Sequence, residues 1–125
     1  MFSSVSGTIT TDASGDATIY LAHRETCNPN GFVYCIKYTP GTLDTGADLT
    51  ITSERFGVPI LSKLNAGTSV AYFFPRVFPN SSADGAAGTV ASELIPVKDD
   101  RIKVVVAQGG NVKQGTIEVI LLTDL

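Results

Sequence analysis

The last quarter of the chain carries the strongest β-strand signal. Apolar residues alternate with other residues over 101–107 and over 116–122, and a glycine-rich segment separates the two runs. Side chains two positions apart lie on one face of a strand, so each run predicts a strand. We expect the two strands to form a hairpin. Its buried face would hold Ile102, Val104, Val106, Ile117, Val119 and Leu121.

The opposite face of this predicted hairpin is only partly polar. It carries Lys103 and Val105 on one strand and Ile120 and Leu122 on the other. A strand that is apolar on both faces needs a cover on each side. A second sheet of the same chain is one such cover, and a neighbouring subunit is the other. The residues alone leave both covers open.

Shorter runs upstream predict the remaining strands. Turn-forming residues recur roughly every ten residues, the spacing of an all-β sandwich or barrel, and no window sustains a helical period. The first two strands are expected to pair as a hairpin around a turn at 12–16. The predicted runs are 5–11, 17–22, 32–38, 47–52, 58–61, 70–77 and, more weakly, 93–97.

These patterns predict an all-β fold. We expect one domain over residues 1–125, an antiparallel β-sandwich of jelly-roll-like or immunoglobulin-like type with eight to nine short strands. Residues 1–4, with Phe2 among small polar residues, are an N-terminal arm or a frayed end. Residues 80–88 have the composition of a flexible exposed loop. In the third strand, the alternation places Phe32, Tyr34, Ile36 and Tyr38 on one face.

Composition argues against several classes of function. Charged residues make up 17% of the chain, the net charge is -3, and the nine Lys and Arg are scattered. A nucleic-acid partner would require a basic excess, so none is expected. No signal peptide or membrane-spanning run is predicted, so synthesis in a reducing cytoplasm is expected. Cys27 and Cys35 flank a turn and are expected to be reduced, although a hairpin there would bring them close.

No catalytic constellation is evident in the sequence. His23 is the only histidine and is expected to lie in an exposed loop. The aspartates, including Asp99 and Asp100, match no calcium loop, and Asp is a good turn residue. The Gly109–Gly110 pair lies between strands, not before a helix, so a turn is expected there and no phosphate site. The predictions are therefore no enzyme, no cofactor and no metal.

Three segments resemble the small structural proteins of tailed bacteriophages: residues 7–18, 46–52 and 101–110. The resemblance implies a capsid decoration (cement) protein on the virion surface, which binds the shell of major capsid protein and acts as a homotrimer. A head–tail connector or tail component is the alternative within phages. A carbohydrate- or cell-surface-binding sandwich module is the alternative from another class. The candidate interface residues are Phe2, Tyr72, Phe73, Phe74, Phe78, Ile120, Leu122 and Leu125.

Overall fold

The computed structural model of the chain describes residues 1–22 and 28–123, and within these ranges it contains nine strands and no helix. The all-β prediction is therefore confirmed. In the described ranges no helix is long and apolar enough to cross a membrane. The strands are β1 (Phe2–Thr10), β2 (Ala17–Leu21), β3 (Gly31–Thr39), β4 (Asp48–Ser53), β5 (Pro59–Lys63), β6 (Ala71–Phe73), β7 (Ile95–Val97), β8 (Ile102–Ala107) and β9 (Gln114–Leu122).

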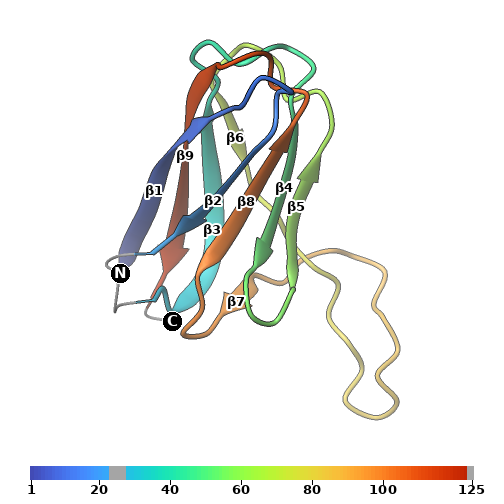
Figure 1. Cartoon of the computed structure of the whole chain (residues 1–125). Coiled ribbons are helices and arrows are strands. Elements are labelled where there is room, and N and C mark those ends of the chain that lie inside the picture. Colours follow the sequence, from blue (N-terminus) through green and yellow to red (C-terminus); the bar gives the residue numbers. More distant parts are fainter. Residues whose placement is uncertain (23–27, 124–125) are drawn as a thin grey trace.

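The strands form two antiparallel sheets that pack as a sandwich (Figure 1). Sheet A has the order β1-β9-β3-β6, and the short β7 also pairs with β3. Sheet B has the order β2-β8-β4-β5. Both sheets interleave strands from the two ends of the chain, and most connections cross from one sheet to the other. This is the connectivity of a jelly roll and decides between the two sandwich types that the sequence left open.

Both hairpins expected from the sequence are wrong. Strand β8 pairs with β2 and β4, whereas β9 pairs with β1 and β3, so the two C-terminal strands lie in different sheets. Likewise β1 and β2 belong to opposite sheets. The alternation correctly identifies the buried faces of β8 and β9, but it does not identify the partner of either strand. The C-terminal strands instead face each other across the core.

The core lies between the two sheets and takes most of its side chains from the inward faces of β1, β3, β4, β8 and β9. The six C-terminal residues predicted to be buried are each at most 1% exposed, as are Leu49 and Ile51 of β4. Tyr38 of β3 is also fully buried, but its hydroxyl has no hydrogen-bond partner among the described residues. Burial raises the pKa of this phenol above its usual value.

A β-bulge in β3 corrects the predicted face of that strand. The register with β9 shifts between Val33 and Cys35. As a result Val33 is fully buried and Tyr34 is turned outward, while Ile36 and Tyr38 remain in the core. The expectation that Phe32, Tyr34, Ile36 and Tyr38 share one face is therefore wrong, because the strand holds one residue more than its partner.

Two boundaries also differ from the predictions. Strand β1 begins at Phe2, so residues 2–4, expected in an N-terminal arm, are part of sheet A. Strand β6 covers only Ala71–Phe73 of the run predicted over 70–77. The residues after β6 leave the sandwich in a long excursion before β7 (Figure 1).

The Gly109–Gly110 pair lies in the β8–β9 connection, where three loops meet. A Cβ atom on Gly109 would lie 2.8 Å from the Thr11 side chain and 3.2 Å from that of Leu43, so only glycine fits. Its carbonyl accepts a hydrogen bond of 3.0 Å from the Asp44 N–H, and its own N–H donates to Gly15. The predicted turn is confirmed, and its glycines serve close loop packing.

Candidate interaction surface

The outer face of sheet A carries a patch of exposed aromatic and aliphatic side chains. The rings of Phe2 and Tyr34 meet edge-on with their centroids 5.0 Å apart, and Tyr34 meets Phe74 in the same way at 6.0 Å. These three rings come from β1, β3 and the residue after β6, so the patch spans the width of the sheet. We call Phe2, Tyr34, Phe74, Ile120 and Leu122 the outer patch.

The strand register explains why these residues meet. Leu122 of β9 stands between its Cα partners Phe2 of β1 and Phe32 of β3. Ile120 stands in the next outward row, and both β9 residues are half-buried. The bulge then adds Tyr34 to this face, where an unbulged strand would have turned it inward. The two-sided apolarity of β9 is thus real, because its inward face fills the core and its outward face belongs to the outer patch.

Arg76 holds the aromatic rings against the segment that follows β6. Its guanidinium donates hydrogen bonds to the carbonyls of Tyr34, at 3.0 Å, and Pro75, at 2.7 Å. It also stands 5.6 Å from the centroid of the Tyr34 ring, in cation–π range. Arg76 therefore links the outer patch to the start of the excursion between β6 and β7.

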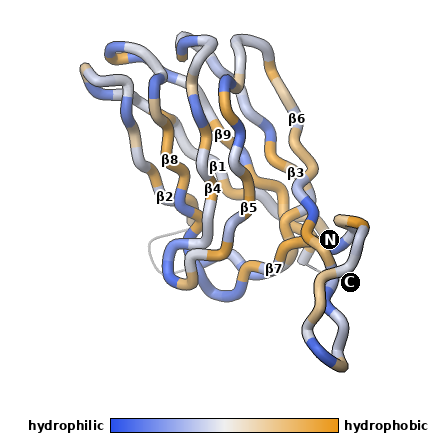
Figure 2. The backbone as a smooth tube through the Cα atoms, turned by 90° about the vertical axis from the view of Figure 1, so that its right-hand side faces the viewer, coloured by the Kyte–Doolittle hydropathy of each residue, from blue (hydrophilic) through white to orange (hydrophobic). Residues whose placement is uncertain are grey.

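The excursion is an arm that projects away from both sheets, as Figures 1 and 2 show. We call residues 77–93 the β6–β7 arm. Backbone bonds between Val77 and Glu93 close its base, at 2.9 and 3.0 Å, and the Gly88 N–H donates to the Pro79 carbonyl at 2.7 Å. All of its residues are exposed. Its structure rests on its own backbone pairs, with no packed core beneath it.

The β6–β7 arm exposes apolar side chains that a free surface does not require. Phe78 is 50% exposed and Val90 67%. The arm contains two acidic residues, Asp84 and Glu93, and no Lys or Arg. Exposed apolar groups that extend from an aromatic patch are typical of a protein–protein contact surface.

The other half of the outer face of sheet A is polar. A hollow of about 280 Å³ lies at the far end of β1, β9 and β3. It is lined by Thr8, Thr39, Gly41, Gln114, Gly115 and Thr116. Lys37 and Glu118 form the boundary with the outer patch as Cα partners, and Lys37 also lies 5.9 Å from the ring centroid of the exposed Tyr72.

Cys35 is a free thiol buried beside the outer patch. Burial raises its pKa above the usual value, the charge of Glu118 adds to this, and Arg76 opposes it. A thiol with a raised pKa is a poor nucleophile and a poor metal ligand. Cys35 is 5% exposed in strand β3. Cys27 and His23 lie outside the described residues.

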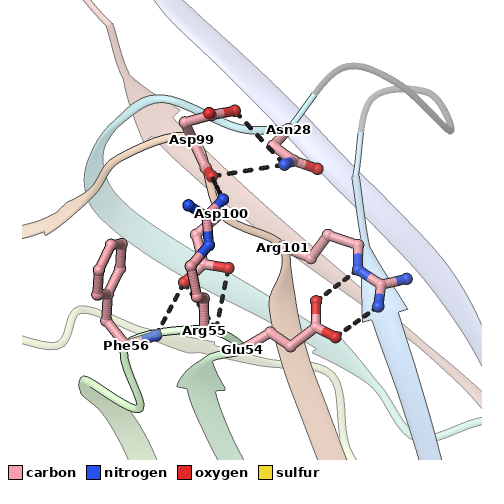
Figure 3. A network of polar contacts seen from close by, with 7 residues as sticks. All are labelled: Asn28, Glu54, Arg55, Phe56, Asp99, Asp100 and Arg101. Carbon is pink, nitrogen blue, oxygen red and sulfur yellow. Dashed lines mark hydrogen bonds and ion pairs between the residues drawn. The ribbon is translucent and has the colours of Figure 1, made fainter.

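A polar network at the opposite end from the Gly109–Gly110 turn fixes two turns of the sandwich (Figure 3). Asp100 is 2% exposed, and its carboxylate accepts hydrogen bonds from the backbone N–H groups of Arg55, at 2.9 and 3.0 Å, and Phe56, at 3.3 Å. The Arg101 guanidinium makes a bidentate ion pair with Glu54. This bond holds the pKa of the Glu54 carboxyl below its usual value. The carboxylates here are used to connect the β4–β5 turn to β8.

Two further aspartates, Asp12 and Asp48, accept backbone hydrogen bonds in turns and loops through their carboxylates. Asp12 accepts bonds from the N–H groups of Ser14 and Asp16, at 2.8 and 3.0 Å, and Asp48 accepts one from Asn65 at 2.9 Å. Within residues 1–22 and 28–123, no group of three or more His, Cys, Asp or Glu is placed to hold a metal ion. Asp12 thus has the turn role that is usual for aspartate.

The structure brings together most of the candidate interface residues. Phe2, Phe74, Ile120 and Leu122 lie in the outer patch, Tyr72 lies on the same face, and Phe78 extends it onto the β6–β7 arm. Phe73 was also a candidate interface residue, but it packs against the core instead, because it alternates with Tyr72 and Phe74 along the chain. Leu125 lies outside the described residues. Sequence reasoning missed Tyr34, Arg76 and Val90 as members of this surface.

No protein-family model, curated protein or solved structure matches this chain. The resemblance to tailed-phage virion proteins therefore remains a prediction.

Proposed function

We propose that this chain is a structural protein of a tailed-phage virion. It binds the shell of major capsid protein on the surface of the head and stabilises the particle as a decoration, or cement, protein. The resemblance of residues 7–18, 46–52 and 101–110 to such proteins motivates this role. The role needs a broad contact surface and no chemistry of its own.

The observation that carries the proposal is the β6–β7 arm beside the outer patch. The arm exposes Phe78 and Val90 on a segment without a core of its own, and the outer patch adds Phe2 and Phe74, each more than half exposed. Contacts that hold a shell together are broad and partly apolar, on the order of 1,500 Å² in total for a stable interface. An arm joined to an apolar sheet face offers a contact surface of this partly apolar character.

The first test removes the apolar groups of the arm. The double variant Phe78→Ser, Val90→Ser should fold normally, because both side chains are exposed, and should no longer bind shells that lack the protein. The matched control is Leu64→Ser, Val70→Ser. Those residues are 66% and 53% exposed in the β5–β6 connection, at the other end of the sandwich (Figure 1). Co-sedimentation with shells measures binding, and equal binding by both double variants would overturn the assignment of the arm.

The second test charges the sheet face. Ile120→Asp, Leu122→Asp places carboxylates in the middle of the outer patch and should abolish shell binding while circular dichroism stays native. Val105→Asp, on the outer face of sheet B, is the control and should bind normally.

The cementing role has a test of its own. Particles assembled without the chain should lose resistance to heat. Unchanged particle stability would remove the cementing role.

Two observations separate this role from its alternatives. The copy number per virion distinguishes decoration, with many copies over the head, from a connector or tail component, with a single ring. A carbohydrate-binding module is favoured only by Tyr34 and Tyr72, whose rings are exposed on the same sheet face as the threonine-lined hollow. A glycan array without hits would set that candidate aside. The resemblance implies a homotrimer, which light scattering of the purified chain tests.

A further inference from the structure

Strand β1 is the outermost strand of sheet A, and one of its edges has no partner strand among the described residues. The Thr11 N–H donates to the Lys113 carbonyl at 2.9 Å, and the Thr123 N–H donates to the Met1 carbonyl at 2.8 Å. In an antiparallel pair, bonded and non-bonded residues alternate. The odd-numbered residues of β1 therefore bond to β9. The N–H and C=O groups of Ser4, Ser6 and Thr8 point to the free edge.

This edge lacks the protection that proteins usually give to exposed strands. Strand β1 is nine residues long and contains no charged residue and no proline, and its pairing with β9 runs without a bulge. Such an edge is a template for pairing with another strand, and natural proteins block it with charges, prolines, bulges or short length.

The other edges of the sandwich are blocked in these ways. On sheet B, β5 begins at Pro59, ends at Lys63 and meets β4 across a register shift, and β2 has only five residues. On the far side of sheet A, β6 and β7 have three residues each. Strand β1 is thus the one long, unprotected edge in the described part of the chain.

We infer that this edge is an interface between two copies of the chain, in which β1 pairs antiparallel with β1 of the second copy and sheet A continues across the pair. The occupant follows from the chemistry of the edge, which requires a flat, uncharged, extended strand of similar length. Strand β1 itself meets this requirement and is present at equal concentration.

The sequence of β1 is complementary to itself in this arrangement. A two-fold axis at Ser6 places Ser4 opposite Thr8 of the second copy. In this register the two β1 strands overlap along their full length. Serine and threonine side chains directly opposite each other form favourable hydrogen-bonded pairs, and no like charges meet. The shared strand pair would satisfy backbone groups that have no partner strand among the described residues.

The pairing has a consequence for binding. An antiparallel strand pair within one continuous sheet has its two-fold axis perpendicular to the sheet, so the outer faces of both copies point the same way. Both outer patches would then face one surface. Two linked contacts bind more tightly than one, because the second forms at high effective concentration. The pairing itself does not depend on the identity of that surface.

The test uses a proline that removes one edge donor. Ser6→Pro deletes an N–H that faces the free edge and leaves the bonds between β1 and β9 intact. Ser6→Ala removes the hydroxyl but retains the N–H. By analytical ultracentrifugation at micromolar concentration, the unchanged chain and Ser6→Ala should have the mass of two chains, and Ser6→Pro the mass of one. The pair of chains is an alternative to the homotrimer that the phage resemblance implies, and the measured mass distinguishes the two. A mass of one or three for the unchanged chain, or two for a folded Ser6→Pro, would overturn the inference.

If Ser6→Pro fails to fold, hydrogen exchange of the unchanged chain tests whether β1 pairs with β1 of a second copy. The amides of Ser4, Ser6 and Thr8 should be protected in concentrated samples and exchange rapidly on dilution. The amides of Val5, Gly7 and Ile9, bonded to β9, should stay protected in both conditions. Rapid exchange of the even-numbered amides at every concentration would contradict the pairing.

Discussion

The two sheets of this sandwich contribute to one core but differ on their outer faces. The outer face of sheet A carries the outer patch, the base of the β6–β7 arm and the open edge of β1. The corresponding face of sheet B is mostly polar, with Val105 set between Thr18 and Thr50, and its edges are blocked. The asymmetry supports the proposal that sheet A contacts other molecules while sheet B faces solvent.

The largest loss of stability should come from changes in the shared core, and the loss should be similar for the two sheets. Leu121→Ala in sheet A and Leu49→Ala in sheet B each truncate a side chain that is at most 1% exposed. Each should lower the free energy of unfolding by about 2–5 kcal/mol, from lost burial and the cavity left behind. Urea denaturation measures this, with the exposed Leu64→Ala as a near-neutral control. A small loss for one of the two core variants would mean that the sheets do not share the core equally.

The next largest loss of stability should come from the polar network that fixes the turns at one end of the sandwich. Asp100→Ala removes a buried carboxylate and leaves the N–H groups of Arg55 and Phe56 without their acceptor. The free energy of unfolding should fall by about 1–3 kcal/mol, the usual cost of orphaned buried donors. Asp12→Ala, whose carboxylate accepts bonds in an exposed turn, should lose less by the same measurement. The reverse order would show that the Asp100 network is dispensable.

A smaller effect of opposite sign is expected in sheet A. Tyr38→Phe removes a buried hydroxyl with no partner among the described residues and retains the ring. The free energy of unfolding should stay unchanged or rise by up to about 1 kcal/mol, because the folded state no longer buries an unpaired polar group. Thermal denaturation at fixed protein concentration checks this. A clear loss of stability would reveal a partner for that hydroxyl.

The smallest effect is a dependence on acid at the Glu54–Arg101 ion pair. The bond from Arg101 lowers the pKa of Glu54 in the folded chain. Its stabilising contribution is therefore full above the ordinary carboxyl pKa and is lost as the pH falls through the lower, folded value. Both groups are solvent-exposed, so the contribution is small. The denaturation midpoint is measured at neutral pH and again below pH 4.5. The difference between these two midpoints should be smaller for Glu54→Gln than for the unchanged chain.

The sequence predicts strand positions well where alternation is strong. Strands β4, β8 and β9 begin and end within about two residues of their predicted bounds, and their buried residues are correct. Alternation reports which face is buried, and it is silent about which strand lies alongside. The β8–β9 connection looked like a hairpin turn because of its glycines, whereas those glycines serve the packing of three loops against one another.

The candidate contact surface could be predicted only in part, because periodicity identifies excess apolar residues but no irregularity in a strand. Phe2, Phe74, Ile120 and Leu122 stood out as apolar residues in excess of one core. Tyr34 reaches the surface only through the register shift after Val33, which no periodic pattern predicts. The exposed loop at 80–88 was expected, but the arm of which it is the tip depends on backbone pairs between residues 77 and 93, set by irregular turns.

Imaging of tailed-phage virions made in the presence of this chain tests the proposed capsid role most directly, because it gives copy number, position and orientation together. The expected result is many copies over the head surface, with the β6–β7 arm and the outer patch of sheet A against the shell and sheet B toward solvent. Copies that contact the shell through sheet B, a single ring at the head–tail junction, or particles without the chain would contradict the proposal.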